Sequence, residues 1–162
     1  MIKIFGILLI IFSGCGVGIY FSERLSDKVR RLEKLKYMTD EIMTLIRYRH
    51  LTTNEIVQEL GRNRNFEVFG FENFRDERTF CENWSRWAEE NNVFSDEERD
   101  WLKSFGSTLG ESDTDGQISS ITVHMSRLEK MIAETEIEYR TKGKLFRSLG
   151  LISGVLVAVL II

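Results

Sequence analysis

The chain has no proline and has few of the cysteine and histidine residues that metal sites and many catalytic sites require. Among its 162 residues it has no proline, two cysteines (Cys15 and Cys81) and two histidines (His50 and His124). Two cysteines do not make a disulfide framework, and a structural zinc site needs four ligands. The sequence also lacks a glycine-rich phosphate loop and a nucleophile set. We therefore expect a protein that is not an enzyme and has no metal, no cofactor and no small-molecule substrate.

Positive charge is scarce in the middle of the chain. Residues 51–115 carry seven Lys/Arg against sixteen Asp/Glu, whereas residues 22–50 carry eight against five and residues 116–148 carry six against four. Nucleic-acid binding needs a basic surface, so the acidic middle argues against a nucleic-acid partner.

Both ends of the chain are apolar. Ile4–Phe21 is an uncharged run of eighteen residues, which spans roughly 27 Å as a helix and is just long enough for a bilayer core. Leu149–Ile162 is shorter, at fourteen residues, and spans about 21 Å. We predict an N-terminal transmembrane helix over residues 1–21 and a C-terminal transmembrane or membrane-inserted helix over residues 148–162.

Glycines recur with a spacing of four in both apolar segments. Gly14 with Gly18, and Gly150 with Gly154, make the small-residue spacing used by packed membrane helices. We predict that the two membrane helices pack against each other through these glycines.

Basic residues flank the two apolar segments on the side of the body. They are Arg24, Lys28, Arg30, Arg31, Lys142, Lys144 and Arg147. Basic flanks of membrane segments stay in the cytoplasm. The pattern predicts a cytoplasmic body, an N-terminus outside the cell, and attraction of these residues to anionic lipid.

An alternative topology starts from Phe12-Ser13-Gly14-Cys15, which approaches a lipoprotein cleavage site. Cys15 would then be lipidated and the body exported. The apolar run continues through Val17, Ile19, Tyr20 and Phe21, whereas a mature lipoprotein turns polar, so we favour the membrane helix.

Residues 22–147 are expected to form an antiparallel helical bundle of about six helices. Apolar residues at steps of three and four predict one helix over Ser22–Arg49 and a long last helix from about Thr114. The bundle and its two membrane helices would make the chain all-α.

Shorter helices are expected between the two long ones. Thr52 with Glu55, and Ser95 with Glu98, have the spacing of a capping box at a helix start. A further helix is predicted over Asp76–Asn91. The aromatic cluster Phe66–Phe74 has no clear period and is interpreted as core, with an exposed partner site as the alternative.

The helix after Ser95 ends in a polar turn. Trp101, Leu102, Phe105 and Leu109 form its apolar stripe, and Gly110 stands where a glycine commonly ends a helix. Either Asp113 or Thr114 is expected to cap the last helix, and Thr114 with Gln117 has capping-box spacing.

A family resemblance rests on this region. Phe105, Gly106, Leu109, Gly110, Asp113 and Gln117 spell Phe-Gly-x-x-Leu-Gly-x-x-Asp-x-x-x-Gln, which resembles the signature of the stage III sporulation protein AB family of endospore-forming bacteria. A weaker match comprises Glu41-Ile42-Met43, Tyr48, His50 and Glu55. The family tends to carry Thr-Pro-Leu where this chain has Leu51-Thr52-Thr53, and residues 53–92 match little.

The resemblance implies a role that the composition does not. Family members belong to a channel-like apparatus between mother cell and forespore, and they are similar in fold to the cytoplasmic domains of type II secretion and type IV pilus platform proteins. The implied partners are a secretion-type ATPase (stage III sporulation protein AA) and other membrane proteins of the apparatus. The six signature residues are the implied contact residues, with folding of the turn as the alternative. A membrane-anchored adaptor or sensor unrelated to sporulation, and the exported lipoprotein, remain open.

Overall fold

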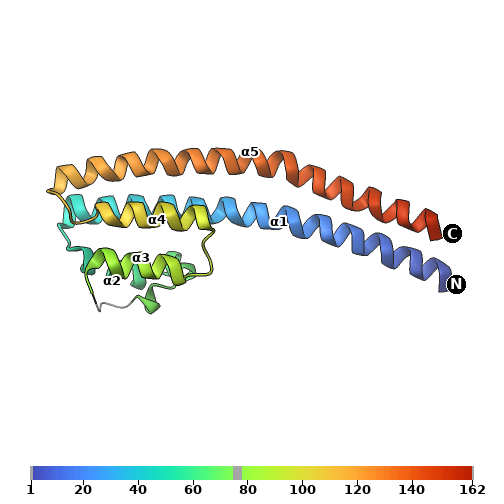
Figure 1. The fold of residues 1–162 in the computed structure, drawn as a ribbon, viewed down its shortest axis with the longest axis horizontal. Helices are drawn as coiled ribbons and strands as arrows, with labels where there is room; N and C mark the ends of the chain where they lie inside the picture. Colours follow the sequence, from blue (N-terminus) through green and yellow to red (C-terminus); the bar gives the residue numbers. More distant parts are fainter. Residues whose placement is uncertain (1, 75–77, 162) are drawn as a thin grey trace. The chain divides into compact units, whose positions relative to one another are not determined.

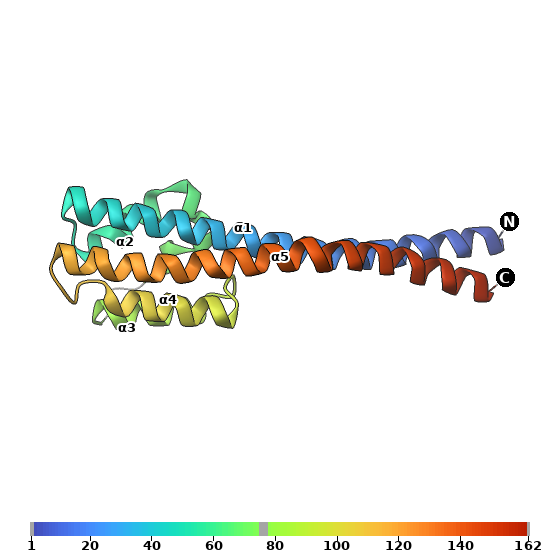
Figure 2. The same cartoon turned by 90° about the horizontal axis from the view of Figure 1, so that it is seen from above.

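The computed structural model describes the backbone of residues 2–74 and 78–161. Side chains are described for the same residues except 2–12, 14, 15, 73, 147, 150, 151 and 153–161. All regular secondary structure in the described part is helical (Figures 1 and 2), so the prediction of an all-α chain is confirmed there. In chain order the elements are α1 (Ile2–Thr44), the π-helix η1 (Leu45–Arg49), α2 (Thr53–Arg62), the 3-10 helices η2 (Arg64–Phe69) and η3 (Phe71–Asn73), α3 (Phe80–Glu90), α4 (Asp96–Thr108) and α5 (Thr114–Ile161).

The chain divides into two compact units. The helical pair comprises Met1–Leu32 and Met131–Ile162, which contain the first part of α1 and the last part of α5, and the bundle unit comprises Glu33–Lys130.

The bundle unit is built around buried aromatic side chains. Helix α3 packs on α4, and α2 packs on η2 and η3. Trp84, Trp101, Phe66, Phe69 and Phe105 are all fully buried. Because such rings bury much apolar area per side chain, they supply most of the core of a unit with short helices.

The segment Phe66–Phe74 contributes to this core, as its default interpretation predicted. Phe66, Phe69 and Phe71 are buried, whereas Val68 is 45 % exposed. Gly70 links the two 3-10 helices with φ at 63°, a left-handed conformation that glycine adopts without steric cost.

Reciprocal capping boxes open three of the helices. Thr52 with Glu55 opens α2 and Ser95 with Glu98 opens α4, as the spacing predicted. Of the helix predicted over Asp76–Asn91, Asp76 and Glu77 lie outside the described residues, and α3 begins at Phe80, after Arg78 and Thr79. Thr79 and Glu82 form a capping box that fixes this start, with the Thr79 N–H donating to Glu82 Oε2 at 3.3 Å.

Within the helical pair, α1 and α5 lie side by side (Figures 1 and 2). Ser22 is fully buried, and a Cβ placed on Gly143 would lie 3.1 Å from Ser22 Oγ. The rings of Phe21 and Phe146 pack with their centroids 5.5 Å apart. Small side chains at Ser22 and Gly143 therefore allow the two backbones to approach closely.

The glycines predicted to pack the two apolar segments are only partly described. Gly18 is buried. The surroundings of Gly14, Gly150 and Gly154, and the side chain of Cys15, lie outside the described residues. Within the described part, none of the helices has both the length and the apolar character required to cross a membrane.

Candidate functional site

The turn between α4 and α5 is held by one glutamine side chain. Gly110 has φ at +83°, and its N–H donates to Gln117 Oε1 at 3.1 Å. Gln117 Nε2 in turn donates to the carbonyl of Ser112 at 2.9 Å. Gln117 thus satisfies polar backbone groups on both sides of the turn, which fixes its shape.

Asp113 caps α5. Its Oδ1 accepts a hydrogen bond from the Gly116 N–H at 3.0 Å, which satisfies one of the free donors at the start of the helix. The alternative capping box of Thr114 and Gln117 was a wrong prediction, because the Gln117 side chain is used across the turn instead.

Gly106 lies where α4 meets the indole of Trp84. A Cβ at this position would lie 2.0 Å from Trp84 Cδ1, so any side chain would displace the indole. Trp84 Nε1 donates to the carbonyl of Leu102 at 2.8 Å, one turn earlier on α4. Gly106 is therefore required for the packing of α3 on α4.

Phe105 joins α4 to α5. It is fully buried and stacks on Trp101 with centroids 5.1 Å apart, and the His124 ring on α5 meets Phe105 edge-on at 5.7 Å. Trp101 Nε1 donates to the His124 carbonyl at 3.1 Å. Burial lowers the pKa of His124 and nearby Arg127 lowers it further, so the imidazole is neutral at pH 7.

The start of α2 lies beside this turn. A Cβ on Gly110 would lie 3.2 Å from Thr53 Cγ2. Just before Thr53, the π-helix η1 ends at His50, whose φ of 50° is left-handed. Tyr48 on η1 is 72 % exposed. Wide helical turns and left-handed residues other than glycine are frequent at functional sites.

Two segments distant in the sequence thus form one surface of the bundle unit. We call the exposed residues Tyr48, His50, Glu111, Ser112 and Asp113 the end surface. Both segments contain residues that match the family, but nothing in the sequence indicates that they are adjacent.

The six signature residues divide by burial. Phe105, Gly106 and Leu109 are buried and shape the turn from inside. Gly110 and Asp113 are exposed and Gln117 is half-buried. A partner of the folded chain can touch only the second group, and this contact stays a prediction.

Most of the predicted membrane-proximal basic residues lie on the helical pair. Arg24 and Lys144 are exposed, Arg30 pairs with Asp27 at 3.2 Å, and Lys28 and Arg31 are half-exposed. Lys142 pairs with Glu138 and lowers the pKa of that carboxyl. The side chain of Arg147 lies outside the described residues.

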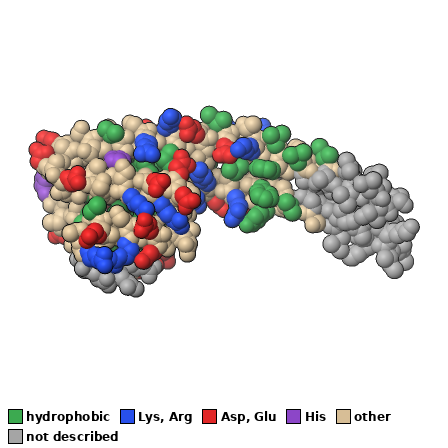
Figure 3. Space-filling view, in the orientation of Figure 1, with side chains coloured by type: hydrophobic (Ala, Val, Ile, Leu, Met, Phe, Trp, Pro, Cys, Tyr) green, Lys and Arg blue, Asp and Glu red, His purple; other side chains and the backbone are tan. Residues whose placement is uncertain are grey.

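The helical pair also exposes apolar side chains (Figure 3). They are 44–65 % exposed and comprise Val17, Ile19, Tyr20, Phe21, Ile137, Leu145, Leu149 and Ile152. The Arg24 guanidinium lies over the Tyr20 ring, 5.4 Å from its centroid. Apolar, aromatic and basic side chains therefore follow one another along this unit.

Among the described residues, no group of three His, Cys, Asp or Glu side chains could hold a metal ion. The close approach of α1 and α5 at Ser22 and Gly143 was not predicted from the sequence. The spacing of glycines within one apolar segment does not show which small residues face each other on two different helices.

Comparison with known proteins gave two matches. The family model described as Stage III sporulation protein AB matches residues 3–162. A stage III sporulation protein AB from Bacillus subtilis (strain 168) is 23 % identical to this chain over 170 residues, covering 99 % of each protein. No solved structure matches the chain.

Proposed function

This chain belongs to the stage III sporulation protein AB family, and from that premise we propose that it is a membrane-anchored, non-enzymatic platform of the sporulation apparatus. In this proposal it couples a cytoplasmic ATPase, stage III sporulation protein AA, to membrane partners. The family assigns the chain to sporulation. The platform role and the ATPase partner are proposed from the family resemblance of the signature residues.

We place the proposed ATPase contact at the end surface. Tyr48 is the most prominent side chain on it, and exposed tyrosines are frequent anchors of protein interfaces. Beneath it the turn is fixed by Gln117 and by the Asp113 cap. A surface that is already ordered loses little conformational entropy on binding, which favours a specific contact.

The helical pair supports the membrane anchor. Its exposed side chains Val17, Ile19, Tyr20 and Phe21 belong to the uncharged run Ile4–Phe21. Tyr20 with Arg24 has the aromatic and basic character of a membrane–water interface. The basic residues that follow favour a bundle unit on the cytoplasmic side.

A photo-crosslinking amino acid at Ser112 tests the ATPase contact. Ser112 is exposed on the end surface, and Cys81, exposed on α3, provides a matched control position. In sporulating cells we expect the Ser112 variant to trap the ATPase and the Cys81 variant to trap none. Equal trapping at both positions, or none at either in well-expressed variants, would contradict the proposal.

Tyr48→Ala separates contact from folding. Tyr48 is largely exposed, so its truncation should leave the thermal unfolding of the chain unchanged while strongly reducing the crosslink from Ser112. A crosslink of undiminished yield would exclude Tyr48 as an anchor of the interface.

A further inference from the structure

Two exposed basic side chains of the helical pair, Arg24 on α1 and Lys144 on α5, lie at a similar level along the pair. Arg24 follows Ser22 by two residues and Lys144 follows Gly143 by one, and Ser22 and Gly143 mark the close approach of the two helices. The helices run in opposite directions (Figure 1). Because a helix rises about 1.5 Å per residue, each basic residue lies within roughly 3 Å of this approach along the helix axis.

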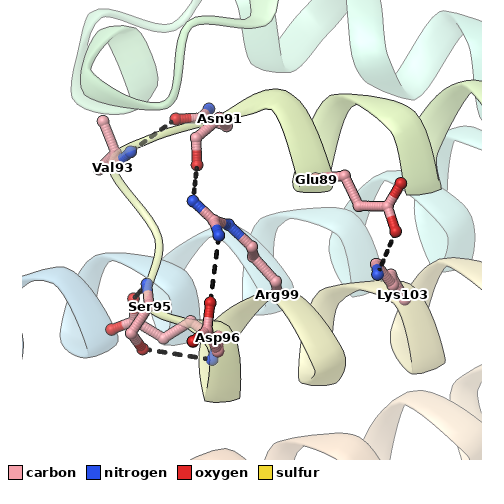
Figure 4. Close-up of polar contacts among 8 residues, drawn as sticks. Glu89, Asn91, Val93, Ser95, Asp96, Arg99 and Lys103 are labelled. Carbon is pink, nitrogen blue, oxygen red and sulfur yellow. Dashed lines mark hydrogen bonds and ion pairs between the residues drawn. The ribbon is translucent and has the colours of Figure 1, made fainter.

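The charges of Arg24 and Lys144 are not neutralised by the described residues. Other basic side chains have carboxylate partners, and the pairs are Arg30–Asp27, Arg140–Glu136 and Lys142–Glu138 in the helical pair, with Arg99–Asp96 and Lys103–Glu89 in the bundle unit (Figure 4). In the described part of the chain no carboxylate pairs with Arg24 or Lys144. Both positive charges are therefore available to an anion from outside the chain.

The Arg24 guanidinium is held by an aromatic ring rather than by a carboxylate. It lies over the ring of Tyr20, one turn earlier on α1, at 5.4 Å from the ring centroid. Stacking uses the face of the guanidinium and leaves the N–H donors at its edge free. These donors can make two parallel hydrogen bonds to a phosphate, and the Lys144 ammonium adds a second positive charge.

The surface next to these two residues, on the side of the chain ends, is apolar. Phe21 precedes Arg24 and is exposed, and Leu145 and Leu149 follow Lys144 and are exposed as well. An apolar surface beside two positive charges suits a phospholipid, whose phosphate is joined to acyl chains, better than a free anion. The order of basic and apolar side chains is the same on both helices, as expected if one lipid lies along both.

We propose that Arg24 and Lys144 together bind the phosphate of one anionic phospholipid, which bridges α1 and α5 beside Ser22 and Gly143. Phosphatidylcholine carries the same phosphate but adds a quaternary ammonium, so its net charge is zero and the site selects an anionic headgroup such as phosphatidylglycerol. This inference rests on the proposed membrane anchor and adds to it a specific lipid site. It is independent of the ATPase contact at the end surface.

The test is native mass spectrometry of the full chain, released from an uncharged detergent micelle that contains equal amounts of phosphatidylglycerol and phosphatidylcholine. The variant R24Q/K144Q removes the site. The control R30Q/K142Q removes the same charge from the same two helices, at residues that pair with carboxylates. We expect the unaltered chain and the control to bind one phosphatidylglycerol with a preference of about tenfold or more, and R24Q/K144Q to lose this preference.

Flotation with phosphatidylcholine vesicles separates the lipid site from the membrane anchor. The unaltered chain and both variants should float with the vesicles. A chain that does not float would refute the anchor and the lipid site together. A chain that floats but does not prefer phosphatidylglycerol, or whose preference survives in R24Q/K144Q, would overturn the lipid site alone. Equal loss of the preference in both variants would also overturn it, because it would show diffuse attraction to the basic surface.

Discussion

At Gly106 the absence of a side chain lets the Trp84 indole lie directly on α4. This partner of Gly106 could not be predicted from the sequence, since a tryptophan 22 positions earlier has no fixed relation to it along the chain. The resemblance treated Gly106 as a contact residue. The packing of Trp84 against Gly106 explains why a glycine stands at this position, without any contact to a partner.

Gly106→Ala is expected to destabilise the bundle unit by about 2 kcal/mol. The new methyl group would displace the Trp84 indole and weaken its hydrogen bond to Leu102, which outweighs the gain in helix propensity. Gly61→Ala on α2 is the matched control, because a Cβ there meets Phe71 only at 3.5 Å, an ordinary contact. Denaturant unfolding of the full chain, followed by tryptophan fluorescence, measures both; equal stability of the two variants would refute the role of Gly106.

His124 should make stability depend on pH. Burial against Trp101 and Phe105, and the charge of Arg127, lower its pKa in the folded chain below the unfolded value of 6.5. The unfolded chain then binds a proton more readily, so stability is complete above pH 6.5 and falls as the pH drops below it.

The measurement compares the free energy of unfolding at pH 7.5 and pH 5.5. The unaltered chain should lose more stability over this interval than His124→Gln, which has no group titrating at this position. Identical losses in the two proteins would show that His124 keeps its unfolded pKa in the folded chain.

Helix starts were predictable where a capping pair stands next to an apolar stripe. The pairs Thr52/Glu55 and Ser95/Glu98 gave the starts of α2 and α4 correctly. The same rule failed for Thr114/Gln117, because a glutamine side chain is long enough to bind the backbone across the turn instead. Local spacing identifies possible caps, and the tertiary arrangement decides which of them form.

Ser95→Ala is expected to destabilise α4 by roughly 1 kcal/mol. Ser95 Oγ accepts from the Glu98 N–H and the Ser95 N–H donates to Glu98 Oε2, so the change removes half of a partly buried capping box. Ser104→Ala, on the exposed face in the interior of α4, is the control and should be close to neutral. Urea midpoints of the two variants measure the difference, and a neutral Ser95→Ala would argue against the cap.

The end of α1 could not be predicted from periodicity. The apolar stripe through Ser22–Arg49 indicates an uninterrupted helix, whereas the structure widens it into a π-helix at Leu45 and ends it at left-handed His50. Neither the π-helix nor the left-handed residue alters the spacing of the apolar residues in the sequence. Tyr48 on this π-helix is highly exposed, so its place on the end surface is visible only in the fold.

Across the whole chain, the sequence predicted the all-α class, the two long helices and the family. These features depend on long periodic patterns and on a motif, both of which are local. The end surface and the proposed lipid site at Arg24 and Lys144 join segments far apart in the sequence, and composition alone does not show that these segments meet.

The central claim is that the apolar ends hold this chain in a membrane with the bundle unit on the cytoplasmic side. Cys81 is a free, exposed cysteine on α3, so it reports the location of that unit. In a Cys15→Ser background Cys81 is the sole cysteine. A second chain with Cys15→Ser, Cys81→Ser and Lys3→Cys reports the N-terminus.

The decisive measurement is labelling of these two chains by a membrane-impermeant maleimide in intact, non-sporulating bacterial cells. The account predicts that the cysteine at position 3 is labelled in intact cells and that Cys81 is labelled only after the cells are permeabilised. Labelling of Cys81 in intact cells would contradict the cytoplasmic orientation and, with it, the coupling to a cytoplasmic ATPase.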